Sequence, residues 1–242
     1  GVGGVSGVVF GKSRLSRQAE RSNIKHLVID EMQDYSRLQY LIIRRMFSCK
    51  MTILGDRAQT MADQQQDVLQ FLPGIFGKDL RRIEMRKSYR NTVEIASYAA
   101  NLIGVTDLEL FERHGMPVLE RDVSDLEAAL REAVDTLFPD EKTYETAAVI
   151  VPDEKTAERA YLILREILAE KDFDCGKRLS WLNRDSSSFK KGLTVTTFYL
   201  AKGLEFDQVV SIFPKDEKRE MMMQAQYIAA TRALHELRVY HI

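Results

Sequence analysis

Short apolar runs rich in β-branched residues alternate along this chain with segments of helical period. The run at 27–29 is followed by a segment, 38–47, whose apolar residues recur at helical spacing, and then by a second run at 52–54. Alternation of this kind is typical of parallel sheets covered by helices. The sequence therefore predicts an α/β fold with acidic residues after the first two strands, at the sheet edge where open α/β proteins bind ligands.

A second series of alternations begins near residue 86. The most favourable boundary lies at 85–87 and divides the chain into a partial first α/β domain, 1–85, and a complete second domain, 86–242. In the second domain we expect strands at 117–119, 147–151, 193–197, 209–213 and 237–242, and helices at 92–103 with Asn91 or Thr92 as N-cap, 155–168 and 220–233.

Two further segments carry specific expectations. The stretch 124–138 has the spacing of an amphipathic helix, and Ser124 followed by Glu127 matches a capping box. The stretch 172–192 is polar and shows neither period, so we expect an irregular loop there.

The charge balance excludes a protein that binds nucleic acid through a global basic field. The chain has 35 Lys and Arg against 36 Asp and Glu, so any such binding depends on local patches. Cys49 and Cys175 lack metal-ligand spacing, which indicates a reducing, cytoplasmic environment. No apolar run approaches the ~20 residues of a membrane span, so no membrane association is expected.

The pair Asp30 and Glu31, directly after the first strand, is the strongest local signal. Adjacent carboxylates at a strand end can hold Mg²⁺ through the first and activate an attacking water through the second. Asp56 and Gln59 follow the second strand, and the Gln59 carboxamide can donate and accept hydrogen bonds at a phosphate. A solvated polar turn remains the alternative for each pair taken alone.

Three residues of the second domain suit a nucleotide. Arg90 precedes a predicted helix and Arg232 lies within another, and each guanidinium presents a planar fork that matches phosphate oxygens. Tyr89 offers a flat ring for a purine base. Single arginines more often form surface ion pairs.

A tight turn follows the strand at 193–197. We expect the turn at Gly203 to expose Lys202 and Glu205 while Leu204 and Phe206 anchor it in the core. An ordinary strand-to-helix connection is the alternative.

Taken in order, these features resemble motifs II to VI of superfamily 1 helicases of the UvrD, Rep and PcrA type, over about residues 26–242. The run at 227–232 supplies the last of the five motifs, and the runs at 33–36 and 202–207 are most similar to the HelD and helicase IV branch. The resemblance implies RecA-like domains of the P-loop NTPase type, here the end of domain 1A (1–85) and a whole domain 2A (86–242).

The resemblance also implies ATP and Mg²⁺ as cofactors in a cleft between the two domains. The catalytic residues it implies are Asp30 as the Mg²⁺ ligand, Glu31 as the base, Gln59 at the γ-phosphate, and Arg90 with Arg232 as the γ-phosphate arginines. The cofactor-binding residues it implies are Tyr89 on the adenine, Glu205 at the ribose, and Lys202 with Gly203 in the same turn.

The chain departs from the family pattern at three places. Residues 6–13 are a near match to a P-loop, but Ser6 stands where Gly or Ala is required and Lys12 is too close in sequence to Asp30. We therefore expect the P-loop upstream, in an N-terminal part of the same protein. Residues 60–64 lack the aromatic that stacks on single-stranded DNA, and Tyr199 replaces a histidine.

Three functions remain open. The first is an ATP-dependent DNA helicase or translocase that acts on single-stranded or duplex DNA. The second is a HelD-like motor that remodels RNA polymerase, which the missing stacking aromatic favours. The third is a non-catalytic module that binds partners, and the retained set of charged motif residues speaks against it.

Overall fold

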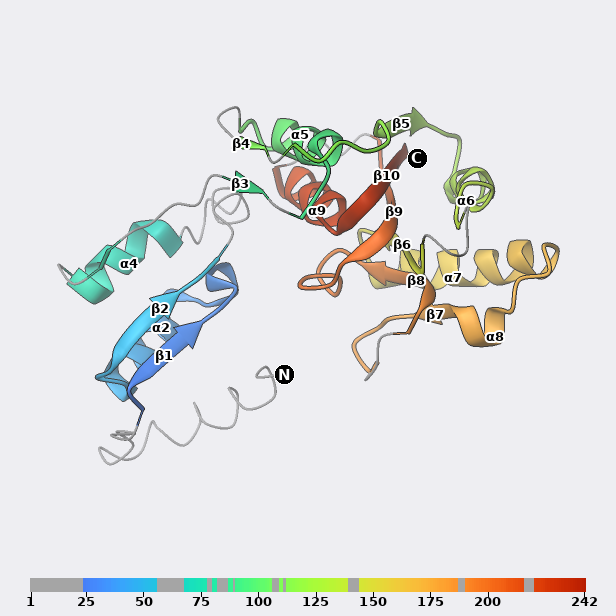
Figure 1. The fold of residues 1–242 in the computed structure, drawn as a ribbon. Coiled ribbons are helices and arrows are strands. Elements are labelled where there is room, and N and C mark those ends of the chain that lie inside the picture. The colour runs from blue at the N-terminus through green and yellow to red at the C-terminus, as the bar shows by residue number, and fades with distance from the viewer. Residues whose placement is uncertain are drawn as a thin grey trace. The chain divides into compact units, whose positions relative to one another are not determined.

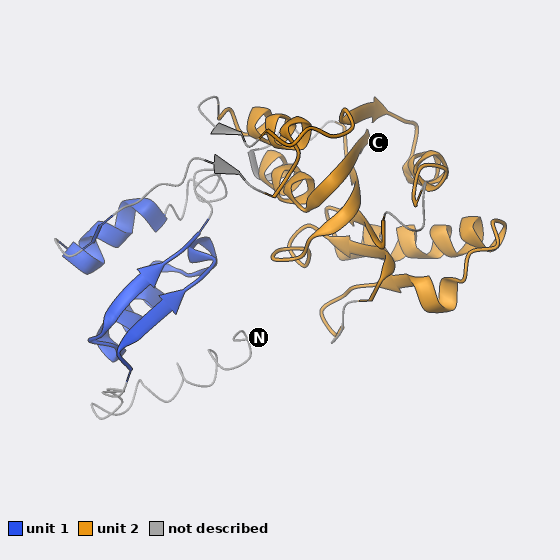
Figure 2. Ribbon diagram, viewed as in Figure 1, with its two compact units in different colours: residues 1–84 blue, residues 85–242 orange. Residues whose placement is uncertain are grey.

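The computed structural model describes residues 24–55, 68–77, 80–81, 87–88, 90–105, 109–110, 112–138, 144–186, 190–215 and 220–242. The chain consists of two compact units, unit 1 (Gly1–Glu84) and unit 2 (Met85–Ile242), coloured separately in Figure 2. Among the described residues no helix combines the length and the apolar character that crossing a membrane requires.

Unit 1 contains a parallel strand pair covered by helices. β1 (His26–Ile29) pairs with β2 (Lys50–Ile53) in the register Ile29 opposite Ile53. The short η1 (Met32–Asp34) follows β1, and α2 (Arg37–Met46) and α4 (Val68–Phe76) complete the described elements. Their shared core consists of Ile29, Met32, Tyr40, Ile43, Val68 and Leu72.

The start of α2 is fixed by a capping box. The Ser36 hydroxyl accepts from the Gln39 backbone N–H at 3.3 Å, and the Gln39 side chain accepts from the Ser36 N–H at 2.7 Å. This reciprocal pair satisfies two N–H groups that a helix terminus otherwise leaves open. The cap therefore sets the angle at which α2 leaves the turn after β1.

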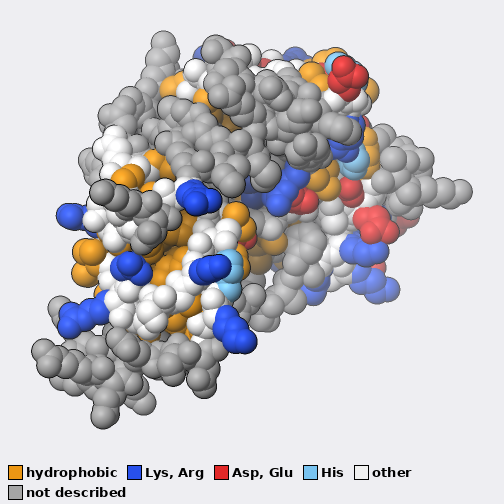
Figure 3. All heavy atoms as spheres, turned by 60° about the vertical axis from the view of Figure 1, so that its left-hand side comes forward, with side chains coloured by type: hydrophobic (Ala, Val, Ile, Leu, Met, Phe, Trp, Pro, Cys, Tyr) orange, Lys and Arg blue, Asp and Glu red, His pale blue; other side chains and the backbone are white. Residues whose placement is uncertain are grey.

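Large apolar side chains of unit 1 also reach solvent. Val28 is 60% exposed and Leu38 is 64% exposed. Hydrophobic side chains with Lys and Arg between them are visible on the surface drawn in Figure 3.

Unit 2 is built on a six-stranded, fully parallel sheet (Figure 1). The strand order is β5-β10-β9-β6-β8-β7, so the chain crosses over between strands that are not neighbours in sequence. The strands are β5 (Leu119–Asp122), β6 (Thr146–Val151), β7 (Leu179–Trp181), β8 (Gly192–Thr197), β9 (Phe206–Phe213) and β10 (Ala233–His241). A separate parallel pair is formed by β3 (Lys87–Ser88) and β4 (Glu109–Leu110).

Helices cover both faces of this sheet. α5 (Val93–Leu102) and α9 (Glu220–Thr231) pack on one face, where Ile95 and Ala229 meet Val209. α6 (Leu126–Val134) and α7 (Glu154–Ala169) pack on the other, where Leu130 meets Val210. Alternate residues of β9 thus serve opposite cores, as the period of two requires. The predicted α/β class with parallel sheets is confirmed.

Two local predictions were wrong. The N-cap of α6 is Asp125, whose carboxylate accepts from the Ala128 N–H at 2.8 Å. The predicted capping box of Ser124 and Glu127 is absent, because Glu127 instead pairs with Arg131 one turn later. The stretch 172–192 is not irregular throughout: α8 (Cys175–Arg178) and β7 form within it. Both elements are too short for a periodic pattern, and pairing with β8 decides the conformation of β7.

Candidate functional site

Asp30 and Glu31 lie directly after β1, at the carboxyl end of the strand pair. Asp30 is exposed, and its carboxylate accepts from the Glu31 backbone N–H at 2.8 Å. Two backbone hydrogen bonds of 2.8 Å, from Leu54 to the Ile29 carbonyl and from Met32 to the Leu54 carbonyl, hold this turn against the end of β2. The strand ends thus place both carboxylates on a fixed turn.

Glu31 occupies the left-handed backbone region, with φ 54° and ψ 55°. This conformation is uncommon for a residue with a side chain. The Gln33 side-chain amide donates to the Glu31 carboxylate at 2.6 Å. Gln33 therefore orients the carboxylate, a contact that was not predicted from the sequence.

Gly55 lies where the two strand ends come together. A Cβ at this position would lie 2.2 Å from Met32 Cγ and 2.8 Å from Gln33 Oε1. Only glycine allows this close approach. The segment that leads to Asp56 and Gln59 is therefore packed against the turn that carries Glu31, although Asp56 and Gln59 themselves lie outside the described residues.

Tyr40 supports the same turn from α2. Its side chain is fully buried, and its hydroxyl donates to the Met32 carbonyl at 2.8 Å. Burial, with the nearby Tyr35 and Asp34, raises the pKa of Tyr40. The hydroxyl therefore remains a neutral donor across the physiological range.

In unit 2, Arg90 and Glu205 form an ion pair. Their side chains approach to 3.2 Å, with the Arg90 side chain 71% exposed and that of Glu205 37% exposed. Glu205 directly precedes β9, and Arg90 precedes the N-cap region of α5. The structure thus brings two of the predicted site residues together.

The turn before Glu205 has the predicted form except at Lys202, which was expected to be exposed and is half-buried. Gly203 adopts φ +77°, a conformation that favours glycine. Phe206 is fully buried and Leu204 packs partly against the same core, while Lys202 is half-buried and Glu205 exposed. The anchoring roles predicted for Leu204 and Phe206 are confirmed.

Arg232 lies at the junction of α9 and β10, where it is 8% exposed. Its carbonyl accepts from the Phe206 N–H at 2.9 Å, one residue after Glu205. The Asn91 side chain donates to the carbonyls on either side of Arg232, to Thr231 at 3.1 Å and to Ala233 at 2.7 Å. Arg90 and Glu205 therefore lie near the backbone of Arg232, at the end of the sheet where β9 and β10 begin, whereas the Arg232 guanidinium donates to the Thr231 hydroxyl at 3.3 Å.

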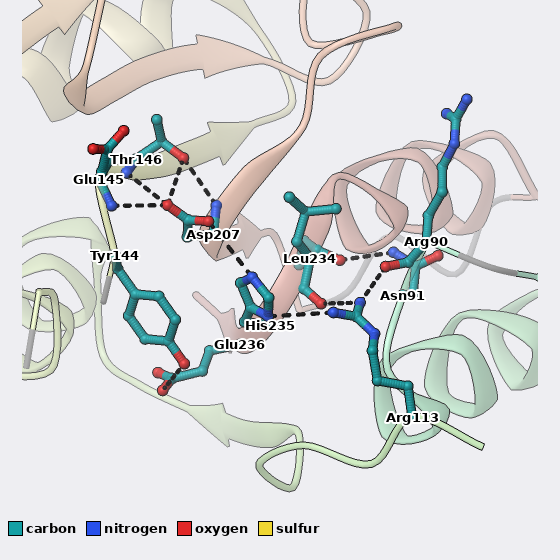
Figure 4. Close-up of polar contacts among 11 residues, drawn as sticks. Arg90, Asn91, Arg113, Tyr144, Glu145, Thr146, Asp207, Leu234, His235 and Glu236 are labelled. Carbon is teal, nitrogen blue, oxygen red and sulfur yellow. Dashed lines mark hydrogen bonds and ion pairs between the residues drawn. The ribbon is translucent and has the colours of Figure 1, made fainter. Parts of the chain in front are cut away.

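A polar network continues from this edge (Figure 4). Asp207 accepts at one carboxylate oxygen from the backbone N–H groups of Glu145 and Thr146, at 2.8 and 3.0 Å. Its other oxygen lies 3.6 Å from His235 Nε2, and the Tyr144 ring stacks on His235 at 5.5 Å. Of these residues only Asp207 lies in a run that the sequence singles out, 202–207, and its contacts with residues distant in the chain leave no local pattern.

The remaining predicted residues are distributed as follows. Gln59 and Tyr89 lie outside the described residues. Asp30 and Glu31 belong to unit 1, whereas Arg90, Lys202, Gly203, Glu205 and Arg232 belong to unit 2. The common cleft expected for all of them stays a prediction. Among the described residues no three His, Cys, Asp or Glu side chains form a metal-binding cluster.

One protein-family model matches part of the chain. Residues 9–61, which include Asp30, Glu31 and Gln59, match the UvrD/REP helicase N-terminal domain. This part of the chain is therefore similar to UvrD-like helicases. A search of curated proteins finds no match.

Several solved helicase structures are also similar. The C-terminal domain of a possible DNA helicase from Lactobacillus plantarum WCFS1 is 24% identical, with a TM-score of 0.48 over 64% of this chain and 88% of that one. The PRRSV helicase is 16% identical with a TM-score of 0.46, over 88% of this chain and 34% of its own length. The arterivirus nonstructural protein 10 helicase, in complex with DNA, is 14% identical with a TM-score of 0.47, over 90% and 40%.

Proposed function

We propose that this chain is the C-terminal part of an ATP-dependent DNA helicase or translocase, comprising the end of RecA-like domain 1A and a whole domain 2A. The observation that carries the proposal is that Arg90, Glu205 and the backbone of Arg232 lie together at the end of the unit 2 sheet where β9 and β10 begin. The three residues come from separate segments, and a protein that used this fold only as a scaffold would have no physical need to assemble them.

The residues of unit 1 suit phosphoryl transfer to water. Asp30 presents an exposed carboxylate for Mg²⁺, and Glu31, oriented by Gln33, can position a water and accept its proton. Bound Mg·ATP supplies the phosphoanhydride bond that is broken. Gln59 is assigned to the γ-phosphate by the family resemblance, and the similarity of 9–61 to UvrD/REP helicases supports this.

The residues of unit 2 suit recognition of the transferred phosphoryl group. The guanidinium groups of Arg90 and Arg232 can bind its equatorial oxygens, which carry the charge of the transition state. Glu205 holds Arg90 by an ion pair and, with Lys202 and Gly203, is assigned to the ribose side. Tyr89 is assigned to the adenine. Because residues 6–13 depart from the P-loop pattern, we assign the phosphate cradle to a P-loop in an N-terminal part of the same protein.

ATP turnover by the full-length protein tests the proposal. We expect turnover to rise on addition of single-stranded or duplex DNA. Absence of ATP hydrolysis, with and without DNA, would overturn the assignment of a motor.

A HelD-like factor that remodels RNA polymerase is the second candidate, because residues 60–64 lack an aromatic for base stacking. Stimulation of ATP turnover by RNA polymerase but not by DNA would select this candidate. A partner-binding module without catalysis is the third, and it predicts no turnover under either condition.

A further inference from the structure

Arg113 connects two segments of unit 2 through its guanidinium. It lies in the loop between β4 and β5, outside the motifs that resemble a helicase. One terminal nitrogen donates both to the Arg90 carbonyl and, at 2.7 Å, to the Leu234 carbonyl. The other lies 3.4 Å from His235 Nδ1 (Figure 4). A single planar group thus joins the segment before α5 to the first residues of β10.

The loop that carries Arg113 is itself fixed to α5. The Arg113 carbonyl accepts from the Val93 N–H at 2.9 Å. The Glu94 carboxylate accepts from the Gly115 N–H at 2.9 Å and lies 3.0 Å from His114 Nδ1. The half-buried Arg113 is therefore held on both its backbone and its side chain, unlike a surface arginine in solvent.

Asn91 makes a second bridge between the same two segments. Its amide donates to the Thr231 and Ala233 carbonyls, which flank Arg232. Together Asn91 and Arg113 donate hydrogen bonds to the backbone carbonyls of Thr231, Ala233 and Leu234, close to Arg232 in the sequence. Arg113 also donates to the backbone carbonyl of Arg90. The backbone positions of the two arginines are consequently linked through the side chains of Asn91 and Arg113.

This linkage matters because the Arg90 side chain is largely exposed. Its reach toward a phosphate depends on where its backbone lies and on the pair with Glu205. Misplacement of a reacting group by 1 Å can reduce a rate about 100-fold. Lysine keeps the charge of Arg113 but not this arrangement, because its flexible ammonium lacks the planar geometry that directs one nitrogen to the Arg90 and Leu234 carbonyls and the other toward His235 Nδ1.

We propose that Arg113 is a positioning residue that holds Arg90 and Arg232 in one fixed arrangement for phosphoryl transfer. The proposal rests on the function proposed above, in which both arginines contact the γ-phosphate. Asn91 contributes from the opposite side of the α9–β10 junction.

The first test is the Arg113→Lys variant of the full-length protein. We expect kcat for ATP hydrolysis to fall about 100-fold while KM changes by less than about threefold, because the contribution is made mainly in the transition state. The thermal midpoint of unit 2, measured in the 242-residue chain by the fluorescence of Trp181, its single tryptophan, should remain near that of the wild type. Arg121→Lys is the matched control, since Arg121 pairs with Glu132 at 2.7 Å away from the junction, and it should leave kcat unchanged.

The second test needs no nucleotide. In the 242-residue chain, the NMR signal of the Arg90 guanidinium should move when Glu205 is changed to Gln, because the ion pair is lost. In an Arg113→Lys background the same substitution should leave that signal in place, because Arg90 no longer reaches Glu205. Arg113→Gln, which can donate to one carbonyl but not span both segments, provides a second variant if the lysine variant does not fold.

The outcomes are distinct. An Arg90 signal that still responds to Glu205→Gln without Arg113 would overturn the positioning role, as would a normal kcat. A broad change of unit 2 signals with an equal loss of thermal stability would show that Arg113 is only structural. If the wild-type protein does not hydrolyse ATP, the proposed function fails, and the NMR comparison still decides whether Arg113 positions Arg90.

Discussion

The Arg90 guanidinium lies 3.2 Å from the Glu205 carboxylate, although the two residues come from distant parts of the sequence. Both side chains are accessible to solvent, and ion pairs of this kind contribute only about 0.2–1 kcal/mol to folding. The pair is therefore too weak to explain its geometry through stability. Under the proposed function, the pair would orient Arg90 toward the bound nucleotide.

Arg90→Ala should separate the contribution of Arg90 to stability from its proposed contribution to ATP turnover. We expect ATP turnover by the full-length protein to fall about 1,000-fold, the range lost when an arginine that stabilises the transferred phosphoryl group is removed. The free energy of unfolding should change by less than about 1 kcal/mol. Urea titration monitored by Trp181 fluorescence measures the second quantity. Arg131→Ala, which breaks the exposed pair with Glu127, should match the stability change without the loss of turnover.

Glu31→Gln should abolish ATP turnover in the full-length protein while ATP binding is largely retained. The amide keeps the shape of the side chain but cannot accept a proton, and general-base catalysis contributes about 100- to 10,000-fold. Steady-state hydrolysis and equilibrium titration with Mg·ATP measure the two effects. Near-normal turnover would show that Glu31 is not the base. The exposed Glu158, changed to Gln in the same way, is the control.

Tyr40→Phe should destabilise unit 1. The substitution removes the hydroxyl that donates to the Met32 carbonyl at 2.8 Å, and an unsatisfied buried group costs about 1–3 kcal/mol. Hydrogen exchange should become faster for amides of β1 and α2 and stay unchanged for those of β9, which belongs to a separate core. Equal exchange rates in β1 before and after the substitution would contradict this role of the hydroxyl.

The Glu94 carboxylate should make the free energy of unfolding of unit 2 decrease at acidic pH. The Gly115 backbone N–H, together with the N–H of Glu94 itself and the His114 side chain, lowers the pKa of Glu94 from 4.5 to about 2. Because the folded value lies below the unfolded one, the stabilisation is complete above pH 4.5 and is lost as the pH falls toward 2.

The Glu94→Gln variant tests this sign. Its urea midpoint, followed by Trp181 fluorescence, should fall less than that of the wild type between pH 4.5 and 2. Parallel curves for the two proteins across that interval would show that the carboxylate contributes nothing there.

The 242-residue chain alone should not bind Mg·ATP at micromolar concentration. In P-loop enzymes the backbone amides and the lysine of the loop bind the β- and γ-phosphates. The proposed site residues of this chain would act on a nucleotide that such a loop has already bound. We expect a dissociation constant near the millimolar level, about −4 kcal/mol. Calorimetric titration measures it. A micromolar constant that Lys12→Ala abolishes would instead place a working phosphate loop at 6–13.

Periodicity carried most of the fold prediction. The strands around 27–29, 147–151 and 209–213 were identified because each is a short continuous apolar run, and burial on both faces of a parallel sheet requires such runs in β6 and β9. The helix after Thr92 was identified because its apolar residues recur at helical spacing. Thr92 caps α5, as expected, by accepting from the Ile95 N–H. β7 was not predicted because three residues cannot display a period.

The candidate site was only partly accessible from sequence. Arg90, Glu205 and Arg232 were found because they lie in motifs with a fixed order. Asn91 and Arg113 were not, since their function comes from contacts with the carbonyls of Thr231, Ala233 and Leu234, far away in the chain. Such contacts depend on tertiary structure and leave no local pattern.

The left-handed backbone conformation of Glu31 has a consequence for experiments that select variants at this position. Glycine and asparagine occupy that region at lower cost than glutamate, by roughly 1 kcal/mol, whereas the proposed role of Glu31 as the base demands a carboxylate. A library randomised at this position and selected only for folded yield should therefore enrich Gly and Asn, and one selected for motor activity should retain Glu. Thermostabilising substitutions proposed from backbone preference alone would inactivate the protein at this position, a local case of stability opposing activity.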